Sequence, residues 1–245
     1  MKKMILGAVL CGCAVALAGA ANADQNGNFL FGSTDALIMG PTGVPTPDAA
    51  YVHAAQTLYL DPNGYGGTAA TTLPFTTPET YEFLPSVNQG VKDLVDKVVT
   101  DYNAGEMNCS DSGICGDPLT IFGYSQSSAI IALAEPQLAA QNIPSDALRF
   151  VMLGANPAGT PDDFYPTAVY NINGDFWADP TSIGANPTPQ DLLAALILHF
   201  TYLGLTPAEI DSATPVVEGM TTVFNIPTLT LDEVWEALFR ALLAS

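Results

Sequence analysis

The stretch "PLTIFGYSQSSAIIALAE", residues 118–135, decides the fold class of this 245-residue chain. It begins as a short apolar segment typical of a buried strand and continues as an alanine-rich segment typical of a helix. The sequence Gly-Tyr-Ser-Gln-Ser at residues 123–127 lies at the join, where a sharp turn would lift the side chain of Ser125 clear of a sheet. Two interpretations are open: Ser125 is a nucleophile on a strand-to-helix elbow, or it only caps the helix.

Segments of strand and helix character alternate on both sides of this join. Strand character is found at residues 28–39, 119–123, 148–157 and 167–174, and helical character at 46–56, 91–102, 127–141, 188–200 and 231–242. This alternation is the order expected of a mainly parallel sheet covered by helices. The strand, turn and helix around Ser125 then favour an α/β-hydrolase fold with helices on both faces of the sheet.

Three helix starts carry capping signals. Thr46 is the expected N-cap of the first helix, and Thr188 precedes a proline at the first helical position of a later one. Thr230 and Glu233 have the spacing of a capping box at the start of the last helix.

The first residues have the pattern of a signal peptide. Lys2 and Lys3 form the positive start, residues 5–17 the apolar stretch, and Ala21-Asn22-Ala23 the small-residue cleavage site. The sequence therefore predicts a signal peptide at residues 1–23 and an exported protein, either secreted or associated with the cell envelope. The remaining residues 24–245 suit a single α/β-hydrolase domain, since they contain no internal repeat or low-complexity linker.

The charge balance is strongly acidic. The chain has 6 Lys+Arg and 25 Asp+Glu, which give a net charge of −19, and loss of the two lysines of the signal peptide makes it −21. This excludes nucleic acid as a partner, because binding phosphates needs a basic surface. With 48% hydrophobic and only 13% charged residues, the chain has ample material for a core.

Two cysteines remain after the predicted cleavage, Cys109 and Cys115. In an exported chain a pair this close in sequence most simply forms one disulfide. The alternative is a pair of metal ligands, which we disfavour because no histidine or further cysteine lies nearby. No metal and no organic cofactor is expected.

A serine nucleophile needs a base and an acid, and both candidates lie downstream of Ser125. Of the two histidines, His53 is predicted to be a partly buried residue of a helix, whereas His199 follows Ser125 in the order Ser, acid, His of α/β-hydrolases. The acid should follow a strand between them, where Asp175 and Asp179 are found. We favour Asp175, which comes directly after a strand-like run, and keep Asp179 as the alternative acid.

An oxyanion formed at this site would need backbone N–H donors. The amide of Gln126, the residue after the serine, is the expected first donor. The second should come from the loop after the first strand, where Pro41 and Pro45 lack an N–H, so Thr42 or Gly43 is expected to provide it.

The chain resembles the PE-PPE domain family of mycobacterial and related envelope proteins, which are cutinase-like serine α/β-hydrolases. The resemblance spans nearly all of residues 24–245. It is carried by these segments: "GPTGVPTPDAAYV" at 40–52, "FTTPETYEFLPSVNQGV" at 75–91, "FGYSQSSA" at 122–129, "GDFWADP" at 174–180 and "LHFTY" at 198–202. In that family Ser as well as Gly follows "GYSQ", so Ser127 fits the family's elbow.

The resemblance implies an esterase or lipase-like hydrolase that acts on acyl esters or lipids, with Ser125, Asp175 and His199 as the triad. Two alternatives stay open. The first is an acyltransferase that moves fatty acyl groups onto trehalose-type envelope glycolipids through the same acyl-enzyme. The second is a catalytically silent binding protein of the envelope surface that keeps the hydrolase scaffold.

Overall fold

The computed structural model describes residues 28–155, 164–182 and 186–243, so the predicted signal peptide at 1–23 lies outside the described residues. At its centre is a seven-stranded sheet built from β1 (Ala36–Ile38), β2 (Thr72–Pro74), β3 (Leu119–Tyr124), β4 (Leu148–Leu153), β5 (Thr167–Ile172), β6 (Thr214–Glu218) and β7 (Thr221–Ile226). The strand order is β2-β1-β3-β4-β5-β7-β6, and every neighbouring pair is parallel except β6 with β7. The predicted α/β fold with a mainly parallel sheet is confirmed.

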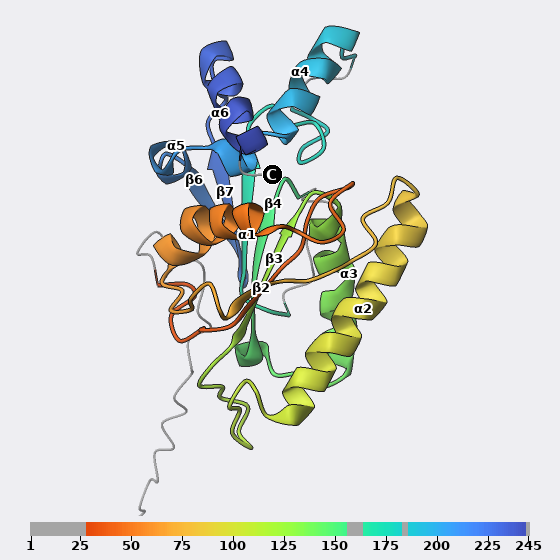
Figure 1. The fold of residues 1–245 in the computed structure, drawn as a ribbon, viewed down its shortest axis with the longest axis vertical. Helices are drawn as coiled ribbons and strands as arrows, with labels where there is room; N and C mark the ends of the chain where they lie inside the picture. The colour runs from red at the N-terminus through yellow and green to blue at the C-terminus, as the bar shows by residue number, and fades with distance from the viewer. Residues whose placement is uncertain (1–27, 156–163, 183–185, 244–245) are drawn as a thin grey trace, which may run out of the picture.

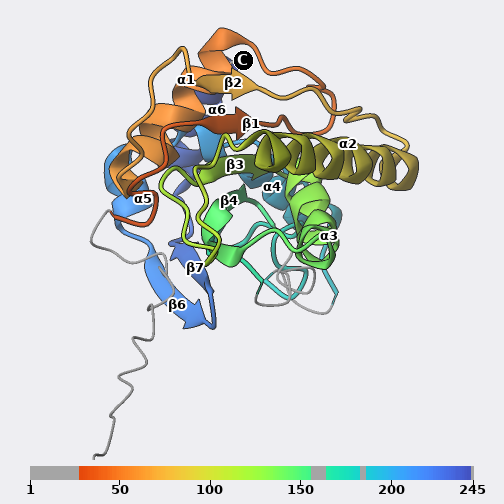
Figure 2. The same ribbon diagram turned by 90° about the horizontal axis from the view of Figure 1, so that it is seen from below.

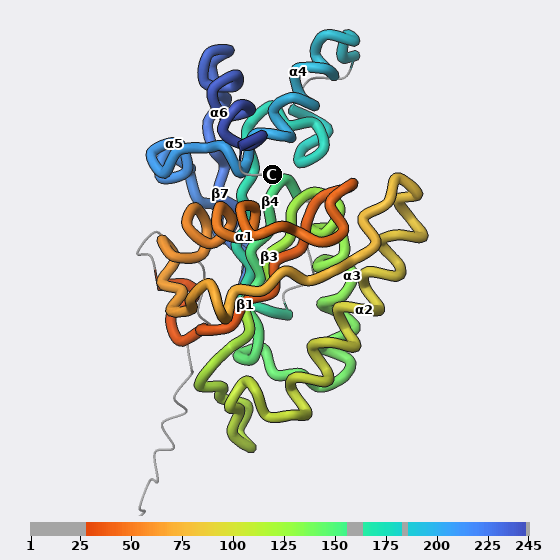
Figure 3. Tube along the Cα trace, in the orientation of Figure 1, coloured from red at the N-terminus to blue at the C-terminus, as the bar shows by residue number. Residues whose placement is uncertain are grey.

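The helices cover both faces of this sheet. They are α1 (Ala49–Ala55), α2 (Phe83–Ala104), α3 (Gln126–Ala140), α4 (Pro189–His199), α5 (Pro207–Asp211) and α6 (Leu231–Leu243), with short turns η1 (Gln56–Leu60), η2 (Asp61–Asn63), η3 (Ser145–Ala147) and η5 (Tyr202–Gly204). The long helix α2 lies beside α3 on one face and α1 lies on the other, as Figures 1 and 2 show. The tube in Figure 3 shows α4 and α6 together at one end of the sheet. None of these helices, within the part of the chain described, is long and apolar enough to cross a membrane.

The central strands are buried on both faces, as parallel strands between helical layers must be. Consecutive residues of β3 pack in different hydrophobic clusters. Ile121 lies in the cluster of α2 and α3, and Phe122 lies in the cluster of α1. Phe150 and Val151 of β4 divide in the same way. This follows from the two-residue period of a strand, which sends neighbouring side chains to opposite faces.

The strand order creates a switch point between β1 and β3. From β1 the chain goes outward to β2, and it then returns through α2 to β3 on the other side of β1. At such a point the loops after the two strands leave the sheet in opposite directions, and the crevice between them is the usual ligand site of open α/β sheets. The loop after β1 and the elbow at Ser125 therefore meet there.

The capping predictions for the two later helices are confirmed, and the prediction for the first is wrong. Thr188 forms a capping box with Asp191 at the start of α4, and Thr230 pairs with Glu233 before α6. The cap of α1 is Asp48, whose Oδ1 accepts the N–H of Ala50 and of Tyr51 at 2.9 Å each. The hydroxyl of Thr46, the expected cap, instead forms a hydrogen bond with the hydroxyl of Thr76 at 2.8 Å.

The predicted disulfide between Cys109 and Cys115 is confirmed. It closes a small loop between α2 and β3, where the two cysteines also form an isolated backbone bridge. The N–H of Cys115 donates to Asp146 Oδ2 at 2.9 Å, which ties the loop to the segment before β4. The disulfide thus fixes the approach of the chain to β3.

We predict that Gly204→Ala lowers the free energy of unfolding by about 1–3 kcal/mol, because α6 packs directly on this glycine. A Cβ there would lie 1.7 Å from the carbonyl oxygen of Ala237, a backbone atom that cannot rotate away. The matched control is Gly66→Ala, whose Cβ would meet its neighbours at 3.6 Å and beyond. Urea unfolding measures both. Equal midpoints for the two variants would contradict the packing of α6 on Gly204.

Candidate active site

Ser125 stands on a strained turn between β3 and α3. Its backbone has φ 58° and ψ −112°, a conformation that L-residues rarely adopt and that costs about 1–3 kcal/mol. The N–H of Ser125 donates to the carbonyl oxygen of Leu153 in β4 at 3.0 Å, which anchors the turn to the sheet. Although Ser125 occupies the N-cap position of α3, its side chain makes no capping hydrogen bond among the described residues. The helix-cap interpretation is therefore wrong, because the hydroxyl points elsewhere.

The residues on either side of Ser125 explain how the turn is accommodated. A Cβ on Gly123 would lie 2.9 Å from the carbonyl group of Ser127 and 2.7 Å from Cδ1 of Ile131, so a glycine is required there. Ser127 occupies the position of the second glycine of the common G-x-S-x-G pattern. Its buried Oγ accepts the N–H of Tyr124 at 2.7 Å and donates to the carbonyl oxygen of Tyr124 at 3.0 Å. Serine is thus a bonded part of this elbow.

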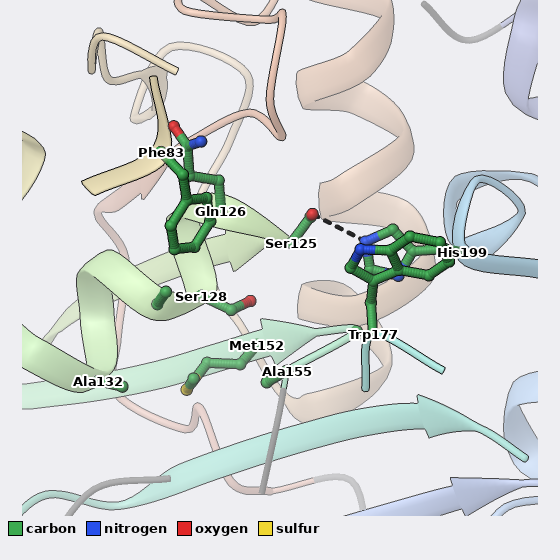
Figure 4. A pocket seen from close by; sticks show the side chains of 11 residues that line it. Phe83, Ser125, Gln126, Ser128, Ala132, Met152, Ala155, Trp177 and His199 are labelled. Carbon is green, nitrogen blue, oxygen red and sulfur yellow. Dashed lines mark hydrogen bonds between the residues drawn. The ribbon is translucent and has the colours of Figure 1, made fainter. Parts of the chain in front are cut away.

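Three side chains form a hydrogen-bonded series at this elbow. Ser125 Oγ lies 2.8 Å from His199 Nε2, the contact drawn as a dashed line in Figure 4. His199 Nδ1 lies 2.7 Å from Asp175 Oδ2, and the side chain of Asp175 is 0% exposed. The structure therefore brings together the three residues expected from chain order, and the arrangement can pass a proton from the serine to the imidazole.

Asp175 is held in place by several donors. Its Oδ1 accepts the N–H of Trp177 at 3.0 Å, and its Oδ2 accepts the hydroxyl of Tyr202 at 2.9 Å. Burial raises the pKa of Tyr202 well above its usual value, so this hydroxyl stays protonated and remains a donor at neutral pH. Asp175 follows β5 in a turn where Gly174 has φ 100°, which aims the carboxylate at His199.

His199 is the last residue of α4, and neighbouring groups fix its ring. The hydroxyl of Tyr124 donates to the carbonyl oxygen of His199, and burial keeps this tyrosine neutral by raising its pKa well above the usual value. Gly154 follows β4 with φ 58°, and a Cβ there would lie 2.9 Å from Cε1 of His199. The ring of Trp177 lies 5.7 Å from the imidazole on another side.

The two alternative residues lie outside this series. Asp179 Oδ1 accepts the N–H of Thr181 at 2.9 Å and its hydroxyl at 2.7 Å, so this carboxylate caps its own turn. His53 lies in α1 as expected but is exposed, so the prediction that it is partly buried is wrong. The geometry therefore favours Asp175 over Asp179 as the partner of His199.

The expected oxyanion donors meet the elbow at the switch point. Gln126 is the first residue of α3 and is 1% exposed, and its Nε2 donates to Thr42 Oγ1 at 3.2 Å. The N–H of Gly43 donates to the carbonyl oxygen of Glu79 at 2.7 Å. Because this amide is already engaged, Thr42 is the favoured second donor and Gly43 is not.

A cavity of about 250 Å³ opens beside Ser125 and His199. Its walls are mostly apolar and include Phe83, Met152 and Trp177 together with Ala132 and Ala155 (Figure 4). A cavity of this kind suits the hydrocarbon part of a ligand, and Ser125 and His199 are polar groups in its lining.

Sequence reasoning missed several of these residues. Tyr124 and Tyr202 hold His199 and Asp175, and Trp177 borders both the cavity and the imidazole. Tyr124 lies next to Ser125, and Tyr202 lies three residues after His199, but each looks like an ordinary core tyrosine in the sequence. The roles of these two tyrosines depend on contacts between residues at least 27 positions apart.

The parallel sheet, the strained serine elbow and the helices on both faces define an α/β-hydrolase-like protein. The PE-PPE domain model matches residues 62–160, and the resemblance to this family is confirmed. The matched segment contains α2, β3, the elbow and α3.

Three relatives from Mycobacterium tuberculosis are similar over most of this chain. They are the uncharacterized PPE family protein PPE28, 30% identical over 230 residues, Esterase PE16, 29% identical over 218 residues, and the uncharacterized PPE family protein PPE63, 27% identical over 250 residues. The alignments cover 80%, 74% and 81% of this chain. They cover only 33%, 39% and 51% of the relatives, so this chain spans between a third and a half of their length.

We predict that Ser127→Ala lowers the free energy of unfolding by about 1–3 kcal/mol, because the N–H of Tyr124 would lose a buried acceptor. The control is Ser112→Ala, which removes an exposed hydroxyl whose one hydrogen bond within the described residues is to that of Ser110. Chemical denaturation of both variants provides the comparison. A Ser127→Ala variant as stable as the control would show that the hydroxyl does not hold the elbow.

Proposed function

We propose that this protein is an exported serine esterase that cleaves acyl esters through an acyl-enzyme on Ser125. The observation that carries the proposal is the hydrogen-bonded series from Ser125 through His199 to Asp175, with distances of 2.8 and 2.7 Å. The PE-PPE domain match and the similarity to a protein named Esterase PE16 support an esterase or lipase-like activity.

In the proposed mechanism, Ser125 Oγ attacks the ester carbonyl carbon while His199 Nε2 takes the hydroxyl proton. Asp175 holds the imidazole by its Nδ1–H and stabilises the imidazolium that forms. His199 then gives the proton to the departing alcohol, which leaves the acyl group on Ser125. Water then attacks the acyl carbon while His199 takes its proton. The bond to Ser125 Oγ breaks, His199 returns the proton to this oxygen, and the carboxylic acid leaves.

The developing oxyanion would be held at the switch point. The amide of Gln126 lies in the first turn of α3, where free N–H groups and the helix dipole favour negative charge. Thr42 would complete the site from the loop after β1. The contact of Ser125 Oγ with His199 Nε2 at 2.8 Å, next to the start of α3, supports this arrangement.

The cavity walls suggest the class of ester. Phe83, Met152 and Trp177 offer an apolar surface to an acyl chain. The net charge of −19 disfavours anionic substrates through long-range repulsion. We therefore infer a neutral acyl ester, with the acyl chain in the cavity.

Export is part of the proposal. It is supported by the lysines, apolar run and small-residue site of residues 1–23 and by the disulfide between Cys109 and Cys115. Disulfides persist mainly in oxidising compartments outside the cytoplasm. The mature chain would begin near Asp24.

We predict that Asp175→Asn lowers kcat on p-nitrophenyl acyl esters by about 10³–10⁴-fold, because the amide would favour the wrong tautomer of His199. Asp179→Asn is the matched control and should keep activity close to that of the unmodified protein. Initial rates at pH 7.5 and circular dichroism of both variants separate loss of chemistry from loss of fold. Loss of activity only in Asp179→Asn would reverse the assignment of the acid.

We also predict that a fluorophosphonate probe labels Ser125 in the folded protein and fails to label Ser125→Ala. Mass spectrometry of the labelled peptide identifies the site. A folded protein that the probe does not label would favour the catalytically silent binding protein.

Product analysis with and without trehalose separates hydrolysis from acyl transfer. Acylated sugar in clear excess over free acid would favour the acyltransferase.

A further inference from the structure

A second strained residue lies beside the elbow. Glu79, in the segment between β2 and α2, has φ 44° and is 1% exposed. Only a few per cent of residues other than glycine have a positive φ, and such a conformation persists only where surrounding contacts hold it. The backbone of Glu79 bonds the loop after β1, and the next residue, Thr80, bonds Gln126, the residue after Ser125.

Two consecutive carbonyl groups of this segment bind the two sides of the proposed oxyanion site. The carbonyl oxygen of Glu79 accepts the N–H of Gly43 at 2.7 Å. The carbonyl oxygen of Thr80 accepts Nε2 of Gln126 at 3.0 Å, and the same Nε2 reaches Thr42 Oγ1. One short segment therefore fixes the loop of Thr42 relative to the elbow.

The buried side chain of Glu79 anchors the segment. Its Oε1 accepts the hydroxyl of Thr77 at 2.8 Å, and the N–H of Thr77 donates to the carbonyl oxygen of Pro45 at 3.0 Å, at the far end of the same loop. Its Oε2 has no hydrogen-bond partner among the described residues. A buried carboxyl group with an unpaired oxygen is better tolerated neutral than ionised.

We propose that Glu79 is a positioning residue, which anchors the segment 77–80 and thereby sets the distance between the Thr42 and Gln126 sides of the oxyanion site. The inference rests on the proposed esterase function. Oxyanion donors stabilise the transition state only when they are already in place, so an error of about 1 Å costs about 10²-fold in rate. Glu79 acts through these donors and has no contact with the reacting atoms.

The protonation of Glu79 gives the proposal a specific signature. Burial raises the pKa of Glu79 from 4.5 to about 7, and the hydrogen bond from Thr77 opposes this shift. The titratable group of α1 that interacts with Glu79 is Tyr51, which stays neutral because burial raises its own pKa well above the usual value. Because the pKa of Glu79 is higher in the folded than in the unfolded protein, its contribution to the free energy of unfolding is fully present below pH 4.5. This contribution is lost as the pH rises through about 7.

The test compares Glu79→Ala and Glu79→Gln with Glu82→Ala, an exposed glutamate three residues later. We expect Glu79→Ala to lower kcat on a p-nitrophenyl acyl ester by about 10–100-fold at pH 6, with KM changed less than about twofold, because the lost contact matters in the transition state. Glu79→Gln should recover most of kcat at pH 6, since a neutral amide keeps the shape and the contact with Thr77. Glu82→Ala should behave like the unmodified protein.

The pH profile distinguishes positioning from general stability. Above pH 7 the kcat of the unmodified protein should decline as Glu79 ionises, and Glu79→Gln should lack this decline. A Glu79→Gln variant with the same profile as the unmodified protein would overturn the proposal, and so would a folded Glu79→Ala variant with full kcat. If Glu79→Ala does not fold, the Glu79→Gln profile alone decides.

A separate variant keeps the two proposals distinguishable. Ser125→Ala that retained activity would refute the proposed function, whatever the result at Glu79. Inactive Ser125→Ala together with normal Glu79 variants would refute only the role of Glu79.

Discussion

The positive φ of Ser125 is the constraint on which the site depends, and contacts with the surrounding chain hold this strained backbone in place. Gly123 lets α3 approach β3 closely, Ser127 bonds both backbone groups of Tyr124, and the carbonyl oxygen of Leu153 holds the N–H of Ser125. These contacts offset a strain of about 1–3 kcal/mol and aim the hydroxyl at His199. The orientation of the proposed nucleophile is thus a consequence of how one helix leaves one strand.

The topology of the sheet places a second constraint opposite the first. Because β1 and β3 are neighbours while the chain between them visits β2 and α2, the loop of Thr42 and the elbow converge at the same edge. The segment before α2 returns to this point and bridges the two: the carbonyl oxygen of Glu79 accepts the N–H of Gly43, and that of Thr80 accepts Nε2 of Gln126. Strained residues on both sides, Ser125 and Glu79, are typical of sites where geometry is fixed before a ligand arrives.

The apolar setting of the site also has a chemical effect. Tyr124 and Tyr202 are buried, and burial raises the pKa of each, so they remain hydrogen-bond donors throughout the neutral range. One holds the backbone of His199 and the other holds the carboxylate of Asp175. The same apolar surroundings continue into the cavity beside Ser125, where they would receive an acyl chain.

Features that arise from local interactions were predictable from the sequence: the alternation of strands and helices, the caps at Thr188 and Thr230, the disulfide, and the order Ser125, acid, His199. Prediction from sequence failed where a neighbour competed, as when Asp48 capped α1 in place of Thr46, and it missed the strands β2, β6 and β7. The folded structure was needed to choose between Asp175 and Asp179 as the partner of His199. It was also needed to show that the N–H of Gly43 binds the carbonyl oxygen of Glu79. The reason is physical: periodicity and capping depend on residues a few positions apart, whereas these partners are 24 to 36 residues apart and meet only once the sheet has set their places.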